Sequence, residues 1–343
     1  MSGLRVEDLR FRYPGAADET LRGLSFEVPQ GGSLALLGDS GAGKTTALNL
    51  LSGLLPCQQG RLLLDDRDVA RLAPAQRGVS QVFQFPVLYE SLSVLDNITF
   101  ALRTRGVARK ERDARGRAVA ERFELTALLG RSIASLSLFE KQLVAFAKAL
   151  APPDLKLVLL DEPLTAVEPA MKWRVRRAVK AALAELGVTL IYVTHDQTEA
   201  LTFADRVCVL YGGEALQIGT PRELFDAPRH VEVARFIGRP AMNLIPLPER
   251  DSAPEDNRNG EWLLGFRPDW ARLAAADAAT VPVRVERVRI TGADAEGPTA
   301  LVDVAGDDWQ ATVAARDDWQ PGDPAGLQID RELRFCDGWA VES

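Results

Sequence analysis

The sequence has 343 residues, of which 46% are hydrophobic and 26% charged, and its formal net charge is −7. This length favours two domains over a single core. The acidic balance disfavours a protein that binds nucleic acid without sequence preference, because such proteins need many Lys and Arg side chains to neutralise phosphates. We therefore expect no nucleic-acid partner.

Cysteine spacing and the lack of long apolar runs indicate a cytosolic chain. Cys57, Cys208 and Cys336 lie far apart and form no C-x-x-C pair, which is typical of reduced thiols and not of disulfides or zinc sites. The N-terminal segment has no apolar stretch of the signal-peptide type. No run approaches the about 18 apolar residues that cross a bilayer. We expect a peripheral protein on the cytoplasmic side of a membrane, attached through a partner subunit.

The first strong pattern follows an apolar run at residues 34–37 and matches the phosphate-binding motif G-x-x-x-x-G-K-[ST]. Its glycines let backbone N–H groups turn toward phosphate oxygens. A helix is expected from Lys44 to Gly53, with its N-terminal dipole directed at the anion. Lys44 is expected to reach the terminal phosphates of ATP, and Thr45 to place its hydroxyl on Mg²⁺. The expected nucleotide residues of this loop are Gly38, Asp39, Ser40, Gly41, Ala42, Gly43, Lys44, Thr45 and Thr46.

Residues 88–150 are charged and helical in pattern, and we expect a helical subdomain here, inserted into an α/β core. Two further apolar runs, 157–160 and 189–193, each precede a polar turn and a helix-like segment. Such strands, buried on both faces, predict a mostly parallel sheet.

The run at residues 157–160 ends in two adjacent carboxylates, Asp161 and Glu162. Asp161 can contribute to a Mg²⁺ shell, and Glu162 can orient or deprotonate the attacking water. An apolar strand that ends in Asp-Glu is common by itself. After a phosphate-binding loop, however, this pattern predicts the catalytic half of an ATPase site.

The composition changes after Asn243, where the sequence becomes rich in Pro, charge and Asn. The segments 281–290, 299–305 and 309–315 then alternate apolar and polar residues and are broken by Gly, Asp and Pro. We expect an ATPase domain over residues 1–240, a linker over 241–260, and a small all-β barrel over 261–343.

With these motifs, the chain resembles the ATPase subunit of an ABC transporter, which implies a P-loop NTPase core of α/β class that binds ATP and Mg²⁺. The resemblance implies that Tyr13 stacks on adenine, although a strand tyrosine in a core is the alternative. It also implies that Gln84 touches Mg²⁺ and signals to the membrane subunit. His195, at the end of the 189–193 run, is implied to contact the γ-phosphate.

The stretch from His195 to Pro246 resembles ATPases of importers for sugars, polyols and related solutes, which end in an oligosaccharide-binding-type barrel, the OB-like TOBE domain. Residues 264–268 resemble the beginning of that domain, and residues 83–89 are similar to importers of glycerol and sugar alcohols. The resemblance implies two membrane permease subunits, a second ATPase subunit, and an extracellular solute-binding protein that acts indirectly. Importers of polyamines, iron or sulfate remain the alternative.

The family signature L-S-G-G-Q is altered in Leu136-Ser137-Leu138-Phe139-Glu140, here called the signature segment. Both glycines, which allow close approach to the γ-phosphate of the partner's ATP, are replaced by Leu138 and Phe139. Glu140 would add negative charge near an anion. Glu168 replaces the aspartate that the family uses at the contact between the two ATPase chains. Ser137 is retained and is expected to contribute to nucleotide binding.

Three interpretations of this segment stay open. A heterodimer would combine Lys44, Asp161, Glu162 and His195 of this chain with an intact signature from a second ATPase. A working homodimer would tolerate the altered signature, and a regulatory subunit would bind ATP with little turnover. ATPases of DNA repair and chromosome maintenance are disfavoured, since the sequence has no sustained heptads and a net acidic charge.

Phe85, Leu88 and Tyr89 lie in the region from Gln84 to Asn97 through which the motion is expected to reach the membrane subunits. Exposed apolar residues of this kind often mark a protein partner site. The alternative is that these side chains pack under the helical subdomain.

Overall fold

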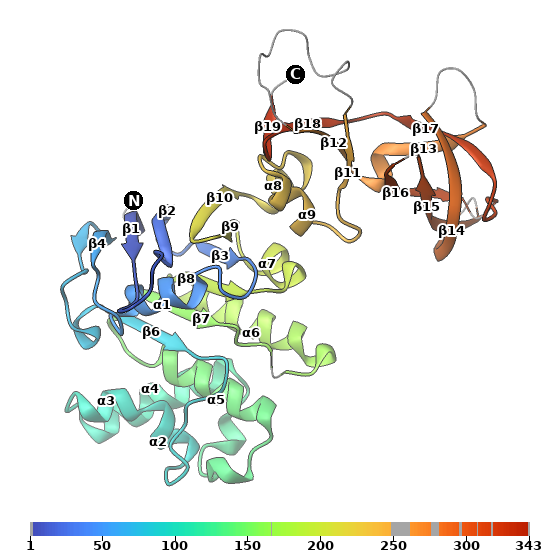
Figure 1. Cartoon of the computed structure of the whole chain (residues 1–343). Coiled ribbons are helices and arrows are strands. Elements are labelled where there is room, and N and C mark those ends of the chain that lie inside the picture. Colours follow the sequence, from blue (N-terminus) through green and yellow to red (C-terminus); the bar gives the residue numbers. More distant parts are fainter. Residues whose placement is uncertain are drawn as a thin grey trace. The chain divides into compact units, whose positions relative to one another are not determined.

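Two compact units, Met1–Pro221 and Arg222–Ser343, make up the chain (Figure 1). The computed structural model describes residues 3–165, 167–247, 261–275, 281–294, 297–306, 308–316 and 318–341. Each unit has its own cluster of buried hydrophobic side chains.

A six-stranded sheet organises the first unit, in the order β10-β9-β3-β8-β7-β6. The strands are β3 (Ser33–Leu37), β6 (Val79–Val82), β7 (Leu157–Asp161), β8 (Thr189–Thr194), β9 (Arg206–Tyr211) and β10 (Glu214–Gly219). From β9 to β6 all neighbours are parallel, and β10 is antiparallel to β9. Every residue of β7 and β8 is buried, as expected for strands covered on both faces. The predicted, mostly parallel sheet is confirmed.

The helices α1 (Lys44–Ser52), α6 (Pro169–Leu186) and α7 (Gln197–Phe203) follow strands β3, β7 and β8. The helix predicted from Lys44 is confirmed, and it ends at Gly53, whose φ of 84° is readily adopted only by glycine. Asp196 caps α7, because its side chain accepts hydrogen bonds from the backbone N–H groups of Thr198 and Glu199. Contacts join α1 to β6 and β7, and α7 to β3, β8 and β9.

An antiparallel sheet of order β2-β1-β4-β5 also belongs to the first unit and was not predicted. Its strands are β1 (Leu4–Phe11), β2 (Leu21–Val28), β4 (Gln59–Leu64) and β5 (Arg67–Asp68). In β1 the apolar alternation shifts phase, because the register slips between Val6 and Leu9 and Asp8 has a φ of 45°. Such a bulge moves the following side chains to the other face. The buried residues of β1 therefore do not show a simple period of two.

The helical subdomain predicted for residues 88–150 is present (Figure 1). It consists of α2 (Val94–Ile98), α3 (Phe100–Thr104), α4 (Arg109–Arg122) and α5 (Leu138–Leu150). Short 3₁₀ turns cover Thr126–Leu128 and Ile133–Ser135, and another, Pro74–Gln76, precedes β6. Contacts join α5 to α2, α4 and β6, so the subdomain attaches to the sheet at the β6 edge.

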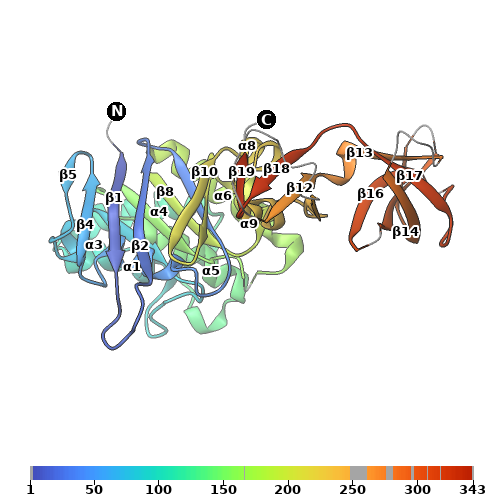
Figure 2. The same ribbon diagram turned by 45° about the horizontal axis from the view of Figure 1, so that its top comes forward.

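In the described residues, the second unit contains the helices α8 (Pro221–Asp226) and α9 (Val231–Phe236) and two antiparallel sheets of orders β11-β12-β18-β19 and β13-β17-β14-β15-β16. The first sheet consists of β11 (Asn243–Pro246), β12 (Trp262–Phe266), β18 (Leu333–Cys336) and β19 (Trp339–Val341). The second consists of β13 (Ala271–Ala274), β14 (Val281–Asp294), β15 (Gly297–Ala305), β16 (Gln310–Arg316) and β17 (Pro324–Ile329), and a 3₁₀ turn, Pro268–Trp270, precedes β13. The end strands β13 and β16 contact each other, so this sheet curls toward a small barrel (Figure 2).

The division between the units falls earlier than the boundary at residue 240 that the sequence indicated, because residues 222–240 pack with the second unit. The buried side chain of Arg267 explains this. Its guanidinium donates hydrogen bonds to the carbonyls of Phe225, Ala234 and Ile237, and lies over the Phe225 ring. Residues 243–246 of the expected linker form β11, and residues 248–260 lie outside the described part.

Candidate functional site: an ATP-binding site at the strand ends

The register of the parallel strands gathers the predicted site residues at one edge of the sheet. Leu37 of β3 pairs with Thr194 of β8, so the loop after Leu37 begins beside His195. Asp161 of β7 pairs with Val193, which places Glu162 next to the same loop. Ligands of open parallel sheets bind at the carboxyl ends of the strands, and the carboxyl ends of β3, β7 and β8 meet here.

The phosphate-binding loop runs from Gly38 to Gly43, between β3 and α1. Gly38 is packed so closely that a Cβ atom would lie 2.2 Å from the carbonyl oxygen of Leu210. Gly43 has a φ of 100°, and a Cβ there would lie 2.7 Å from a methyl group of Leu21. A side chain is therefore excluded at both positions, and the backbone N–H groups of the loop can approach an anion closely.

Lys44, the first residue of α1, is 6% exposed. Its Nζ donates hydrogen bonds to the carbonyl oxygens of Gly38 and Asp39, at 2.8 Å and 2.7 Å. Burial lowers the pKa of the Lys44 ammonium, and the nearby carboxylates, Glu162 first, oppose this shift. A buried cation inside a loop of N–H groups is an arrangement suited to binding phosphate.

Asp161 lies at the end of β7, and its carboxylate oxygen is 3.5 Å from the hydroxyl of Thr45. Burial raises the pKa of the Asp161 carboxyl, and the adjacent Glu162 charge adds to the rise. A carboxylate that is 9% exposed and stands beside a hydroxyl is a donor set that fits Mg²⁺. A bound cation would also offset the unfavourable burial of this charge.

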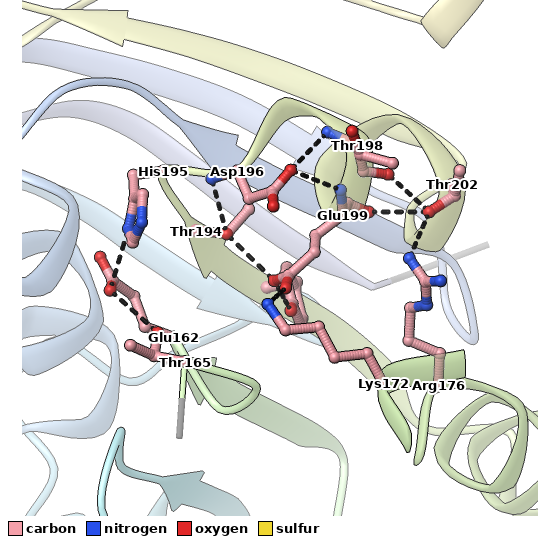
Figure 3. Close-up of polar contacts among 11 residues, drawn as sticks. Glu162, Thr165, Lys172, Arg176, Thr194, His195, Asp196, Thr198, Glu199 and Thr202 are labelled. Carbon is pink, nitrogen blue, oxygen red and sulfur yellow. Dashed lines mark hydrogen bonds and ion pairs between the residues drawn. The ribbon is translucent and has the colours of Figure 1, made fainter. Parts of the chain in front are cut away.

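Glu162 and His195 contact each other across the ends of β7 and β8 (Figure 3). The Nδ1 atom of His195 lies 3.1 Å from Oε2 of Glu162, and the hydroxyl of Thr165 donates to the same oxygen at 3.3 Å. Glu162 has a φ of 45° and donates its backbone N–H to the carbonyl of Val193 at 2.9 Å. Left-handed backbone at a residue other than glycine is rare and gathers at functional sites.

Tyr13 follows β1 and is 40% exposed. Its hydroxyl lies 3.2 Å from the hydroxyl of Thr46 on α1, and its ring packs edge-on against Phe11. Tyr13 is therefore not a core residue but a partly exposed ring beside the first turn of the phosphate-binding helix.

Gln84 lies two residues beyond β6, which is paired in parallel with β7 through Val82 and Leu160. This register brings Gln84 to the same strand-end edge as Asp161 and Glu162. Its side chain is half-buried. Gln84 thus lies just beyond the carboxyl end of β6, at the edge of the sheet where β7 ends in Asp161.

The signature segment forms the N-terminus of α5. The Ser137 hydroxyl accepts a hydrogen bond from the backbone N–H of Glu140, while Glu140 Oε2 accepts from the Ser137 N–H at 2.7 Å and from its hydroxyl at 2.8 Å. This is a complete capping box. The pKa of Glu140 is lowered by its bonds to the Ser137 backbone and side chain. The carboxylate therefore occupies the end of the helix that would otherwise attract an anion.

The two residues that replace glycines differ in their surroundings. Leu138 is 47% exposed, whereas Phe139 is half-buried and lines a pocket of about 200 Å³ together with Leu125, Leu128 and Leu143. Phe139 thus forms part of the wall of this pocket, and Leu138 projects an apolar side chain from the first turn of α5.

A row of exposed apolar residues, here called the Phe83–Tyr89 strip, consists of Phe83, Phe85, Val87 and Tyr89, and their exposed fractions run from 38% to 65%. The buried side chain of Asn97 holds the end of the strip at Tyr89, since it bonds both the backbone N–H and the carbonyl of Tyr89. Lys148 donates to the carbonyl of Val87 and lies over the Tyr89 ring. A pocket of about 260 Å³ lies between β6 and α5 beside this strip.

Sequence reasoning missed two features of the site. Buried Glu199 and half-buried Lys172 form an ion pair, and no local pattern joins two residues so far apart in the chain. The capping box has a signal in the sequence, since Ser137-x-x-Glu140 is the S-x-x-E pattern of a helix N-terminus.

No helix in the described parts of the chain is long and apolar enough to span a membrane.

Comparison with known proteins agrees with this geometry. Residues 21–165 match the ABC transporter family. The chain is 35% identical over 314 residues to the sn-glycerol-3-phosphate import ATP-binding protein UgpC of Brucella abortus, with 88% of each chain covered. It is 35% identical over 313 residues to the diacetylchitobiose uptake system ATP-binding protein MsiK of Streptomyces coelicolor, with 82% of each covered.

Solved structures show the same fold. The chain is similar to cbiO1 of Clostridium perfringens, part of the ABC transporter complex cbiONQ, with a TM-score of 0.61 and 28% identity over 68% of this chain and 93% of that one. Together with the phosphate-binding loop and the paired carboxylates at the strand ends, these similarities show that the chain belongs to the ABC transporter family, as one of its ATP-binding and ATP-hydrolysing subunits.

Proposed function

We propose that this ATPase energises an importer for a sugar, a sugar alcohol, glycerol or glycerol phosphate, working at the cytoplasmic face of the membrane with two permease subunits. The observation that carries the catalytic part is the contact of 3.1 Å between Glu162 and His195 at the end of the phosphate-binding sheet. The names of the relatives, which include glycerol-phosphate, diacetylchitobiose and lactose transport proteins, support the solute class.

In this proposal the loop Gly38–Thr46 binds the phosphates through its N–H groups and Lys44, and Tyr13 stacks on the adenine. Thr45, Gln84 and Asp161 hold Mg²⁺, whose charge would offset that of the phosphates. The short distance between the Thr45 hydroxyl and Asp161 and the burial of that carboxylate support this ligand set.

Glu162 and His195 are assigned the catalytic roles. Glu162 orients the attacking water and accepts its proton, because its carboxylate stands at the strand end beside the phosphate-binding loop. His195 donates to the γ-phosphate, and its side chain, 58% exposed, is accessible to an incoming nucleotide. The contact of 3.1 Å between His195 and Glu162 keeps both side chains together at the site.

We further propose that the chain pairs with a second, different ATPase. The capping box supports this, since the Ser137 hydroxyl and N–H, which a partner's γ-phosphate would need, are already engaged by Glu140. Leu138, exposed on the first turn, adds bulk where the family has glycine. This chain would then complete one hydrolytic site with the partner's signature, while the other site binds ATP and turns over slowly.

The Phe83–Tyr89 strip is proposed as the contact with the permease subunits. Phe85 is 65% exposed, as a partner site requires. Leu88 is half-buried, and the Tyr89 ring lies 4.3 Å from the ring of Phe100 in α3, so Tyr89 also packs against the helical subdomain. The hydrogen bonds of Asn97 hold the backbone of Tyr89 at one end of the strip, as a surface that transmits motion requires. The second unit is proposed to be a TOBE domain of OB-like form, with an extracellular solute-binding protein acting only through the permease.

The test begins with the transporter purified by a tag on this chain in its native host. Glu162→Gln should abolish ATP turnover of the complex while ATP still binds, since the substitution keeps the shape but removes the base. Thr165→Val is the matched control, because it removes only a neighbouring donor to the same oxygen. Full turnover with Glu162→Gln would instead make the chain a regulatory subunit.

The solute is tested by deleting the gene and measuring uptake of labelled glycerol phosphate, glycerol, sugars and sugar alcohols. Loss of one of these, restored by the wild-type gene and not by Lys44→Ala, is expected. Loss of polyamine, iron or sulfate uptake instead would replace the proposed solute class.

A further inference from the structure

A buried polar network lies behind His195 and joins three elements of the first unit (Figure 3). At its centre is the carboxylate of Glu199 on α7, which is 4% exposed. Its Oε1 atom accepts from Nζ of Lys172 on α6 at 2.7 Å. Its Oε2 atom accepts from the hydroxyls of Tyr192 and Thr194 on β8, at 2.5 Å and 3.2 Å.

The network fixes the backbone on both sides of His195. Thr194, directly before it, donates its hydroxyl to Glu199 and accepts the backbone N–H of Asp196, directly after it, at 3.0 Å. Asp196 in turn caps α7, on which Glu199 lies. His195 thus lies between two residues, Thr194 and Asp196, that are both connected through the Thr194 hydroxyl to the buried carboxylate of Glu199.

The other end of the network lies at the beginning of α6. Lys172 is one helical turn beyond Glu168, the N-cap of α6, and donates its backbone N–H to the Glu168 carbonyl at 3.2 Å. The segment from Glu162 to Glu168 connects this helix to the catalytic carboxylate. Glu199 therefore connects to both residues of the catalytic contact. It reaches the loop of His195 through the Thr194 hydroxyl, and it reaches the segment that follows Glu162 through Lys172.

We propose that Glu199 is a positioning residue for ATP hydrolysis, which holds the His195 loop in register with the beginning of α6 so that His195 and Glu162 stay in contact. The inference rests on the roles of His195 and Glu162 proposed above. A carboxylate is required because three donors converge on it, and its two oxygens can accept them all. The acid of the Lys172–Glu199 ion pair is buried, so a loss of this contact would leave a buried charge without its partner. The pair therefore holds α6 and α7 at a fixed distance.

Glu199→Gln is the principal variant. The amide keeps the shape but has one accepting oxygen and two N–H donors, so at least one of the three donors that face it loses its partner. We expect kcat of the purified transporter to fall at least ~10-fold while KM for ATP changes less than ~2-fold, because nucleotide is held elsewhere, by the phosphate-binding loop.

Matched variants separate positioning from simple stability. Lys172→Met should lower kcat similarly, and Lys172→Arg should restore it, because an arginine can still donate to the carboxylate. Thr202→Val is the control, since Thr202 also joins α7 to α6, through Arg176 at 3.0 Å, but lies away from the His195 loop. It should leave kcat unchanged, and the melting temperature of every variant is measured alongside.

A double-mutant cycle tests whether Glu199 acts through His195. In the His195→Ala background, Glu199→Gln should cause no further loss of kcat. An unchanged kcat in Glu199→Gln, or an equal loss of kcat in Thr202→Val, would overturn the inference. A further loss of kcat when Glu199→Gln is added to His195→Ala would also overturn it.

Two outcomes distinguish this inference from the proposed function. If His195→Ala loses turnover but Glu199→Gln keeps it, only the positioning role fails. If His195→Ala itself keeps full turnover, the catalytic role assigned to His195 fails. Should Glu199→Gln not fold, Tyr192→Phe removes one of the same donors with little change in shape, and its kcat, KM and cycle with His195→Ala decide the question in the same way.

Discussion

Glu140 Oε2 lies 2.7 Å from the backbone nitrogen of Ser137, so the N-terminus of α5 is capped by a carboxylate from the chain itself. In a helix that is meant to receive a phosphate, these N–H groups would be open to the ligand. Here the helix begins with a stabilising intramolecular anion. The altered signature segment is therefore an ordered structure with its own hydrogen bonds, and not simply a degraded motif.

Restoring the signature should give activity to the isolated chain. In the triple variant Leu138→Gly, Phe139→Gly and Glu140→Gln, the bulk and the charge are both removed, and ATPase activity of the chain alone should rise at least ~10-fold. The two glycines should also lower stability, by about 1 kcal/mol each within the helix. Steady-state ATPase assays check this, with Glu140→Gln alone as the control that changes only the charge. An unchanged rate in a folded triple variant that still binds ATP would contradict the proposal that Glu140, Leu138 and Phe139 prevent the signature segment from working.

The capping box predicts a pH-dependent contribution to stability. Its hydrogen bonds to Ser137 lower the pKa of Glu140 from 4.5. A lowered acid pKa stabilises the fold above the usual value, and the contribution is lost as the pH falls through the folded-state pKa. Glu140→Gln, which can keep the box geometry, should therefore be less stable than wild type at pH 7 and approach it below pH 4.5. Urea unfolding at several pH values measures the difference, and an equal loss at all pH values would argue against it.

Gly38 is expected to tolerate no side chain. Gly38→Ala would force its Cβ to within 2.2 Å of the Leu210 carbonyl oxygen in β9, so the phosphate-binding loop must shift and ATP affinity should fall at least ~10-fold. Gly130→Ala is the control, because it is a glycine with nothing near its Cβ position. Titration with a fluorescent ATP analogue measures both. Wild-type affinity in Gly38→Ala would show that the loop does not depend on this close packing.

Part of this structure could be predicted from the sequence. The strands β3, β7 and β8 were predictable because they are buried along nearly all of their length and read as unbroken apolar runs. The order of these runs placed Asp161, Glu162 and His195 after strand ends, where parallel register brings them together. A local apolar pattern was sufficient to predict these strands, because burial on both faces makes nearly every residue of each strand apolar.

The remaining features depend on contacts between distant residues. The bulge at Asp8 concealed β1 by shifting its alternation. The boundary between the units depends on Arg267, whose bonds to carbonyls more than 25 residues away tie 222–240 to the second unit. The Lys172–Glu199 pair likewise spans 27 positions. Neither spacing nor composition could predict these interactions, because a helical or strand period carries no information about them.

Asp161 is expected to destabilise the nucleotide-free chain. Its carboxylate is buried and lies beside Glu162, and both conditions disfavour the charged form. Asp161→Asn should therefore raise the melting temperature without nucleotide at pH 7. For wild type, ATP with Mg²⁺ should raise the melting temperature more than ATP with EDTA does. Asp161→Asn should lose this difference. Thermal denaturation under the three conditions measures both effects, and full Mg²⁺-dependent stabilisation in Asp161→Asn would remove this residue from the ligand set.

Subunit composition of the purified transporter tests the pairing most directly. Native mass spectrometry of the complex, captured by a tag on this chain, counts its copies. We expect one copy together with one different ATPase chain, and turnover that requires Glu162 of this chain. A complex with two copies of this chain and full turnover would contradict the account, because both of its sites would then work with the capped signature segment.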